Sequence, residues 1–328
     1  MGRFVKLTLL LFGAVFAAYW AVYLLRNEWR LGARLQALGA AAQSVVEADP
    51  ARVDPENDGR FVHLVGSASG GPVRDPVLNV GGTGLRLDRT AETYQWVEDK
   101  DANHDRVVRY EQQWRTDRVP SERFDRRTEH HNPDPLPLAS ASFAPAALRI
   151  DAYEVDPAVI AALPATAGLR PEAVGQVIFG GRPMSVEGPW LQSGDPARPG
   201  TGDIRVRLAL VPEGTISVVA RQEGRRLVPW PAADGSPIGL AAPGEVAADR
   251  LTKGEARDNW GEAWRNRLTG TLGVLMGMLF VGMTQADRFG PLRELPPLRR
   301  LGVVALAAIG LAAILCAAGW IGARMTAT

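Results

Sequence analysis

Three long stretches without a charged residue constrain this chain more than any other feature of its sequence. They are Leu7–Leu25, Leu268–Ala286 and Leu301–Ala323, and they contain 19, 19 and 23 residues. About twenty apolar residues in a helix span the hydrocarbon core of a bilayer. The second stretch is the least apolar, because Thr269, Thr271 and four glycines dilute it. The sequence therefore predicts a membrane protein and excludes a freely soluble globule.

Charge and composition exclude several classes of function. The 37 basic and 36 acidic residues give a net charge of +1, so no nucleic-acid partner is predicted. The single cysteine, Cys316, lies in the last uncharged stretch, so neither an intrachain disulfide nor a cysteine zinc site is expected. The chain also lacks a GxSxG nucleophile motif and a phosphate-binding glycine loop. We predict a protein that is not an enzyme and that carries no cofactor.

The flanking residues predict the topology. Tyr19, Trp20 and Tyr23 are typical of an interfacial aromatic belt, which favours an uncleaved anchor over a signal peptide. The short link 287–300 carries four arginines against two acids, so the positive-inside rule places it in the cytoplasm. The N-terminus would lie there too, and the large middle segment would face outside or a lumen. Arginines that flank the middle segment argue the other way, but the rule discounts the flanks of long domains.

These observations predict an α+β membrane protein, with a β-rich extramembrane domain between one N-terminal and two C-terminal transmembrane helices. The expected order is an anchor at 1–27, a juxtamembrane helix and linker at 28–58, the β-rich domain at 59–250, an amphipathic interfacial helix at 251–267, a span at 268–286, a basic loop at 287–300 and a span at 301–323. The interfacial helix carries Trp260, Trp264, Arg265 and Arg267, a combination that favours the membrane surface. It could equally be an N-terminal extension of the second span.

Strand formers and turn residues predict the elements of the β-rich domain. We expect hairpins of Thr93–Val97 with Val107–Trp114 and of Ile204–Val211 with Thr215–Arg221, a glycine break at Gly81–Gly84 and a short helix at Pro157–Leu163. The segments 59–155 and 175–230 share a similar order of strands and glycine breaks, which a duplication would explain. Turn and glycine residues separate the strands of all β proteins, and this explains the pattern equally well.

Small residues recur at four-residue spacing in the apolar stretches, as in Gly13 and Ala17, Gly273 and Gly277, and Ala308 and Ala312. Such spacing lets helix backbones approach closely in lipid. It predicts contact with other membrane proteins or with a second copy of the chain, besides membrane lipid. The high alanine content would also give such spacings by chance.

Several separated motifs resemble the transmembrane protein 43 (LUMA) family. They are Val62–Gly66 in a strand, the pattern Arg89, Glu92, Tyr94, Gln95, Trp96 and Glu98, the stretches Asn27–Arg30, Val53–Arg60 and His130–Pro137, and the block Gly202–Trp230 that begins with Gly202, Asp203 and Arg205. The resemblance covers nearly all of residues 5–285. Family members usually have three C-terminal spans, whereas this sequence supplies two apolar stretches there. The resemblance implies a multi-pass protein with an external or lumenal domain and marks the motif residues as candidate site residues. For Tyr94, Gln95 and Trp96, an ordinary place in a core-facing hairpin is the favoured interpretation.

Two clusters of polar residues could bind a metal. Asp99, Asp101, Asn103 and Asp105 alternate like the ligands of a calcium loop, but His104 and Tyr110 stand where such a loop needs glycine and an acid. A solvated hairpin tip is the favoured interpretation. The pair His130 and His131, with Glu129 and Asp134 nearby, lacks a spaced histidine partner, so no metal site is predicted there either.

The predicted function is therefore non-enzymatic, namely scaffolding, organisation or signalling at the membrane through the large domain. One alternative is a module that binds a lipid or small ligand at the membrane surface, and a more remote one is a membrane-tethered hydrolase. The composition, rich in alanine, arginine and glycine, predicts a bacterial inner membrane with the large domain periplasmic or extracellular. The resemblance implies lamins and emerin as partners in animals, which a bacterium would not offer.

Overall fold

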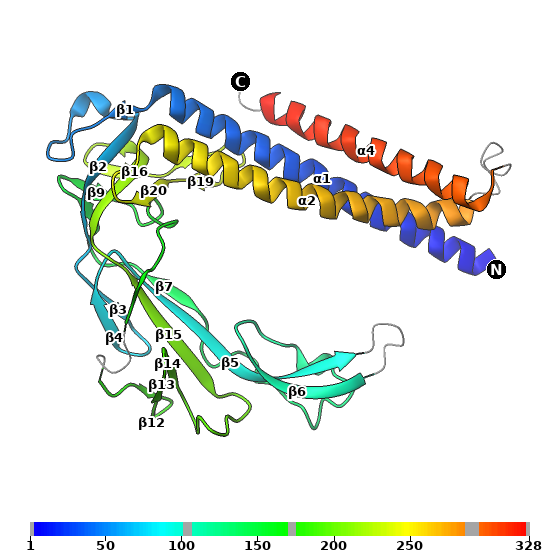
Figure 1. Cartoon of the computed structure of the whole chain (residues 1–328), viewed down its shortest axis with the longest axis horizontal. Helices are drawn as coiled ribbons and strands as arrows, with labels where there is room; N and C mark the ends of the chain where they lie inside the picture. Colours follow the sequence, from blue (N-terminus) through cyan, green and yellow to red (C-terminus); the bar gives the residue numbers. More distant parts are fainter. Residues whose placement is uncertain (1–2, 101–106, 170–174, 286–294, 326–328) are drawn as a thin grey trace.

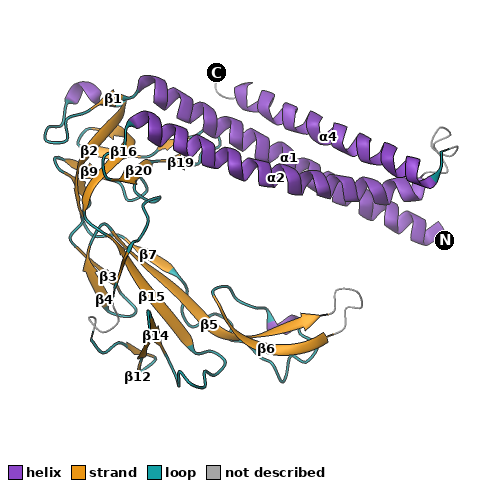
Figure 2. Cartoon of the chain, in the orientation of Figure 1, coloured by secondary structure: helices purple, strands orange, loops and turns teal. Residues whose placement is uncertain are grey.

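The computed structural model describes residues 3–100, 107–169, 175–285 and 295–325. Three long helices lie side by side, and a β-rich domain sits at one end of them (Figures 1 and 2). The helices are α1 (Arg3–Ser44), α2 (Ala248–Gln285) and α4 (Pro297–Met325). This arrangement confirms the predicted fold class. Two described helices are long and apolar enough to cross a membrane, over Phe4–Ser44 and Arg299–Met325.

The helices are longer than the predicted segments. The anchor at 1–27 and the juxtamembrane helix that follows form one unbroken helix, α1. The interfacial helix at 251–267 and the apolar stretch at 268–286 likewise belong to one helix, α2. The interfacial segment is thus an extension of the next one, the second of the two interpretations above. Each of these helices has apolar side chains along one part and polar side chains along the other. Its polar part continues without a break to the β-rich domain.

Close contacts between small residues hold the helices together. A Cβ added to Gly277 of α2 would lie 2.6 Å from the backbone nitrogen of Ala17 in α1, and one added to Gly13 would lie 2.9 Å from the carbonyl oxygen of Gly277. Ala308 and Ala312 of α4 are buried beside Leu24 and Val274. The small-residue faces predicted from spacing are therefore used within the chain. Because Gly13 meets Gly277 and Gly270 meets Leu24, α1 and α2 run antiparallel.

The first sheet lies against the helix ends. Its strand order is β1-β2-β8-β9-β17-β16-β20, and a further pairing of β2 with β16 closes five of the strands into a ring. The bounds are β1 (Val46–Glu47), β2 (Phe61–Ser69), β8 (Arg149–Ile150), β9 (Tyr153–Val155), β16 (Gly214–Glu223), β17 (Arg226–Val228) and β20 (Leu240–Pro243). Its interior is filled by buried apolar side chains, among them Leu64, Ile150 and Val218. A second cluster, with Leu38, Val219 and Trp230, joins this sheet to α1 and α2.

The second sheet lies farther from the helix ends (Figure 1). It has the order β13-β14-β15-β5-β6, with β10 beside β15 and β7 beside β5. The bounds are β5 (Arg86–Lys100), β6 (Val107–Arg115), β7 (Ala141–Phe143), β10 (Ala167–Gly168), β13 (Ser185–Glu187), β14 (Trp190–Gln192) and β15 (Ile204–Val211). Separate two-stranded sheets pair β3 (Pro72–Asp75) with β4 (Val80–Thr83), β11 (Ile178–Phe179) with β12 (Arg182–Pro183), and β18 (Trp230–Pro231) with β19 (Pro237–Ile238). Short 3-10 helices occur at Pro55–Asn57 and Ser121–Arg123.

The structure corrects two expectations for this domain. The segments 59–155 and 175–230 pair with each other, β2 with β16 and β5 with β15, and their origin by duplication stays a prediction. The strands β15 and β16 do not form a hairpin but belong to different sheets, since the chain crosses between the sheets at Pro212 and Glu213. Pro157–Leu163 forms turns rather than a helix. Local sequence predicted these strands but not their partners, which are distant in the chain.

The predicted glycine break and the predicted first hairpin can be compared with the observed strands. The glycine stretch at Gly81–Gly84 is mostly strand β4, whose glycines leave room for close approach of the β3 backbone. The hairpin of β5 with β6 has the predicted pairing, with Thr93 opposite Arg115 and Trp96 opposite Gln112.

Candidate functional site

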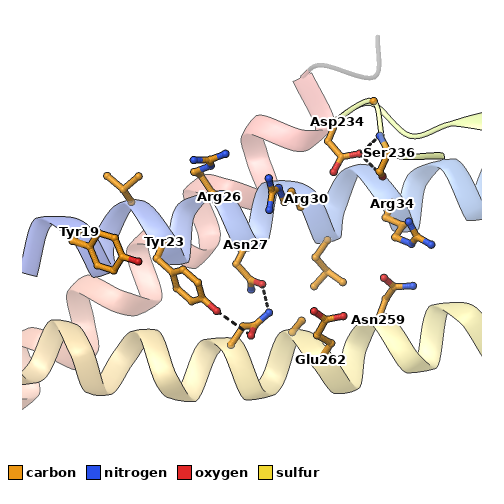
Figure 3. A pocket seen from close by; sticks show the side chains of 15 residues that line it. Tyr19, Tyr23, Arg26, Asn27, Arg30, Arg34, Asp234, Ser236, Asn259 and Glu262 are labelled. Carbon is orange, nitrogen blue, oxygen red and sulfur yellow. Dashed lines mark hydrogen bonds between the residues drawn. The ribbon is translucent and has the colours of Figure 1, made fainter. Parts of the chain in front are cut away.

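A cavity of about 1050 Å³ opens between α1, α2 and the turn that precedes β19, and it is the candidate functional site (Figure 3). It lies where the uncharged part of α1 gives way to its polar part. Its labelled lining residues are Tyr19, Tyr23, Arg26, Asn27, Arg30, Arg34, Asp234, Ser236, Asn259 and Glu262. We call it the interfacial pocket.

One face of α1 supplies the basic wall of the pocket. Arg26, Arg30 and Arg34 follow one another at four-residue spacing, so they lie on one side of the helix. Arg34 is held by Glu255 of α2, with an Nη2–Oε1 distance of 2.7 Å. Within the described residues, Arg26 and Arg30 form no ion pair or hydrogen bond, so their guanidinium groups remain available. These three arginines were not among the predicted site residues, although their spacing directly after the uncharged stretch indicates a shared helix face.

The other walls carry carboxylates. Asp234 accepts hydrogen bonds from the Ser236 backbone nitrogen at 3.0 Å and from its hydroxyl at 2.6 Å. Burial alone would raise the pKa of Asp234, but these bonds, with Arg30 and Arg34 nearby, hold it below its ordinary value. Glu262 comes from α2 and has no ion-pair partner among the described residues. The pocket therefore presents cationic and anionic groups on different walls.

Polar contacts join the two helices along the lining of the pocket. The Tyr23 hydroxyl donates to the Asn266 side-chain oxygen at 3.0 Å, and Asn266 donates to the Asn27 side-chain oxygen at 2.8 Å. These bonds join α1 to α2 next to the apolar segments. The three side chains are half-buried, and each forms a hydrogen bond within this set.

The opposite side of α1 carries a buried ion pair. Glu28 is fully buried, and Arg267 of α2 donates to its two carboxylate oxygens at 2.7 and 2.6 Å. The Arg267 guanidinium also lies over the rings of Trp260 and Trp264, at 5.1 and 4.8 Å from their centres. Arg267 therefore fastens the helices together, whereas Arg265 and Trp264 are exposed as an interfacial role requires.

Motif residues of the β5 strand hold the second sheet together. Arg89 pairs with buried Asp75 at 2.7 Å and donates to the Ala139 carbonyl at 3.0 Å. Arg205 donates to Glu92 at 2.6 Å, and its guanidinium lies 4.8 Å from the ring centre of Trp114. The Arg205 guanidinium also lies 4.5 Å from the Trp190 ring centre, and Tyr94 contacts Trp114 with ring centres 5.0 Å apart.

The remaining motif residues fix loops to the same hairpin. Gln95 is fully buried, donates to the Asp117 carbonyl at 3.0 Å and accepts from the Val119 nitrogen at 2.9 Å. Trp96 exchanges backbone hydrogen bonds with the Asn132 side chain, and Glu98 accepts from the Tyr110 hydroxyl at 2.6 Å. Asp203 accepts from the Gly200 nitrogen at 2.7 Å, beside Gly202 in the left-handed backbone region. These motif residues thus make structural contacts within the second sheet and its loops. Gln95 is buried, whereas Tyr94 and Trp96 are half-buried.

Some of the candidate metal ligands lie among the residues that the structure describes, and others do not. Asp99 lies 3.5 Å from the Arg109 guanidinium, whereas Asp101, Asn103 and Asp105 lie outside the described residues. The His130 ring stacks on Tyr110, with ring centres 3.7 Å apart. Among the described residues, no three side chains of His, Cys, Asp or Glu come together as a metal site would need.

Comparison with known proteins places this architecture in a family. The family model described as Transmembrane protein 43 matches residues 93–325. Transmembrane protein 43 of Rattus norvegicus is 27% identical over 90% of this chain and 79% of its own length, and that of Homo sapiens is 26% identical over the same shares. The Drosophila melanogaster homolog is 27% identical over 95% of this chain and 88% of its own length. No solved structure matches the chain. The matched segment covers well over half of the sequence, so the chain belongs to the transmembrane protein 43 family.

Proposed function

We propose that the protein is a non-enzymatic scaffold that holds its β-rich domain in a fixed position relative to the membrane. The observation that carries this proposal is the continuity of α1 and α2, which run unbroken from the apolar segments into the domain. Leu38 and Ala41 of α1 and Leu251 of α2 are buried in one cluster with Val219 and Trp230 of the domain. A domain mounted on two packed helices presents its surface to partners at a defined height and orientation.

The scaffold proposal includes three membrane spans, with the large domain outside or in a lumen and the link between α2 and α4 in the cytoplasm. It is supported by the contact of α2 with α1 along the uncharged stretch and by the arginines of the link. A bacterial inner membrane stays a prediction from composition. The topology is tested by single cysteines in a Cys316→Ser background, labelled in intact cells with an impermeant maleimide. Labelling at Glu187 but not at Arg299 is expected, and the reverse pattern would contradict the proposed orientation.

Partner contact by the β-rich domain is tested by photo-crosslinking in the native membrane. Val77, Ile178 and Val186 are exposed apolar side chains around the second sheet, with exposed fractions of 53%, 56% and 42%. A photo-reactive residue at these positions should give discrete protein adducts, whereas one at exposed Arg226 of the first sheet serves as the matched control. If all positions give the same diffuse labelling as Arg226, the domain offers no defined partner surface and the scaffold proposal fails.

A second candidate function is binding of a lipid or small ligand at the membrane surface. The interfacial pocket favours it, because the pocket combines unpaired arginines with aromatic side chains at the end of an apolar helix segment. Retention of lipid by the detergent-purified protein, and its loss on substitution of pocket residues, tests this function. The scaffold function does not depend on it.

A further inference from the structure

We propose that the interfacial pocket binds the headgroup of a zwitterionic phospholipid, whose phosphodiester meets Arg26 and Arg30 and whose ammonium group faces Asp234 and Glu262. This inference rests on the second candidate function and names its ligand class. The lipid belongs to the leaflet on the side of the β-rich domain.

The position of the pocket fits a lipid rather than a soluble ligand. Tyr19 and Val22 line its membrane end and are 63% and 56% exposed, although both lie in the uncharged stretch of α1. Arg26 lies about 10 Å farther along the helix than Tyr19, at a rise of 1.5 Å per residue. Acyl chains can therefore lie against Tyr19 and Val22 while the phosphate reaches the first arginine. Tyrosines at this level are typical of the headgroup region.

The basic wall fits a phosphodiester. Guanidinium groups bind phosphate oxygens through paired, charge-assisted hydrogen bonds. Arg26 and Arg30 are one helical turn apart, and neither forms an ion pair or hydrogen bond within the described residues, whereas Arg34 is already held by Glu255. Two neighbouring donors on one face can bind a single phosphate. The ion pair of Glu28 with Arg267 faces away from the pocket, so it does not compete for these arginines.

The carboxylates of Glu262 and Asp234 determine which group beyond the phosphodiester fits the pocket. Glu262 has no cationic partner among the described residues, and Asp234 stands close enough to Arg30 for the two charges to interact. A headgroup with only negative charge would be repelled by these carboxylates, because the charges have the same sign. A headgroup with an ammonium group beyond its phosphodiester places a cation opposite them instead. The distribution of charge therefore favours phosphatidylethanolamine over phosphatidylglycerol with the same acyl chains.

The inference is tested on the delipidated full-length protein in detergent, by native mass spectrometry with phosphatidylethanolamine or phosphatidylglycerol of matched chains. The expected result is tighter binding of phosphatidylethanolamine. Arg26→Gln and Arg30→Gln should each weaken its binding about tenfold, as loss of one charge-assisted hydrogen bond does. Arg225→Gln is the matched control, because Arg225 is an exposed arginine of the β-rich domain outside the pocket, and it should leave binding unchanged.

Four further outcomes distinguish a lipid from a soluble ligand and show which side chains bind it. Glu262→Gln should reduce the preference for phosphatidylethanolamine and leave the phosphate contact intact. Excess glycerophosphoethanolamine, which lacks acyl chains, should not displace the lipid, and displacement would overturn the assignment to a lipid. Equal binding of both lipids, abolished by Arg26→Gln, would overturn the zwitterionic assignment but leave the lipid-binding function standing. Equal binding by the wild type and by both arginine variants would overturn the pocket as a lipid site altogether.

Discussion

The contact between α1 and α2 at Gly277 predicts opposite effects of the same substitution at two places in one helix. In Gly277→Ala the new Cβ would lie 2.6 Å from the backbone nitrogen of Ala17 and 2.8 Å from its Cα, so the helices must move apart. Overpacking of this kind costs typically about 1–3 kcal/mol. The gain in helix propensity, about 0.5–1 kcal/mol for glycine to alanine, offsets only part of that cost. The variant is therefore expected to be less stable than the wild type.

Gly254 of the same helix and Gly310 of α4 provide the matched controls, because an added Cβ at either position meets nothing within 4 Å. Gly254→Ala and Gly310→Ala should raise the unfolding midpoint Tm in detergent. Gly277→Ala should lower it, and the Tm values should differ by about 4 °C. Ala17→Gly should not rescue Gly277→Ala, because two of the nearest Ala17 atoms belong to the backbone. If Gly277→Ala raises Tm as Gly254→Ala does, α1 and α2 do not meet at this crossing.

Three more predictions concern the helices and the β-rich domain. Glu28→Leu should lower stability by about 3–5 kcal/mol because it leaves Arg267 buried and unpaired, and Glu28→Leu with Arg267→Leu should recover most of the loss in thermal unfolding. Gln95→Leu should cost about 1–3 kcal/mol and speed hydrogen exchange at the Val119 amide, which loses its acceptor. Backbone hydrogen bonds from two glycine nitrogens lower the pKa of Glu213 below its ordinary value of 4.5. Its contribution to stability is thus complete above that pH and lost as the pH falls further, so Glu213→Gln should flatten the pH dependence of Tm in this acidic range.

Strongly patterned segments of this sequence predicted their own structure well. Ile204–Val211 alternates apolar and polar side chains, and strand β15 has the same bounds. The hairpin of β5 and β6 follows from strand formers on both sides of a polar tip, and the two strands pair as predicted. These elements depend on residues close in sequence. Their local preferences agree with the tertiary structure, so pattern alone was sufficient.

Pairing between distant segments escaped prediction for a physical reason. Nothing in the residues around Pro212 and Glu213 says that β15 pairs with β5 while β16 pairs with β2, because both strands have a suitable apolar face. A glycine stretch read as a break became β4, since its lack of side chains allows the β3 backbone to approach. For β15 and β16 the partner lies far away in the sequence, whereas β4 pairs with the strand directly before it.

The interfacial pocket was harder still to predict, because it exists only when three separate parts of the chain meet. Arg26 and Arg30 come from α1, Glu262 from α2 and Asp234 from a turn of the β-rich domain. From sequence alone the arginines were considered only for their effect on topology. Their four-residue spacing contained the information that they share a face, but the carboxylates opposite them depended on the antiparallel pairing of α1 with α2.

The same helix links the pocket, the ion pair and the domain. Arg26 and Arg30 face the pocket, Glu28 between them pairs with Arg267 on the other side, and Leu38 is buried in the domain core eight residues beyond Arg30. Since α1 is unbroken from Arg3 to Ser44, no hinge between the pocket and the domain absorbs a rotation of the helix. A lipid that binds one orientation of α1 more tightly than another must therefore shift the orientation of the domain by the same free energy. The two proposed functions, lipid binding and scaffolding, are thus compatible, because both proposals depend on α1.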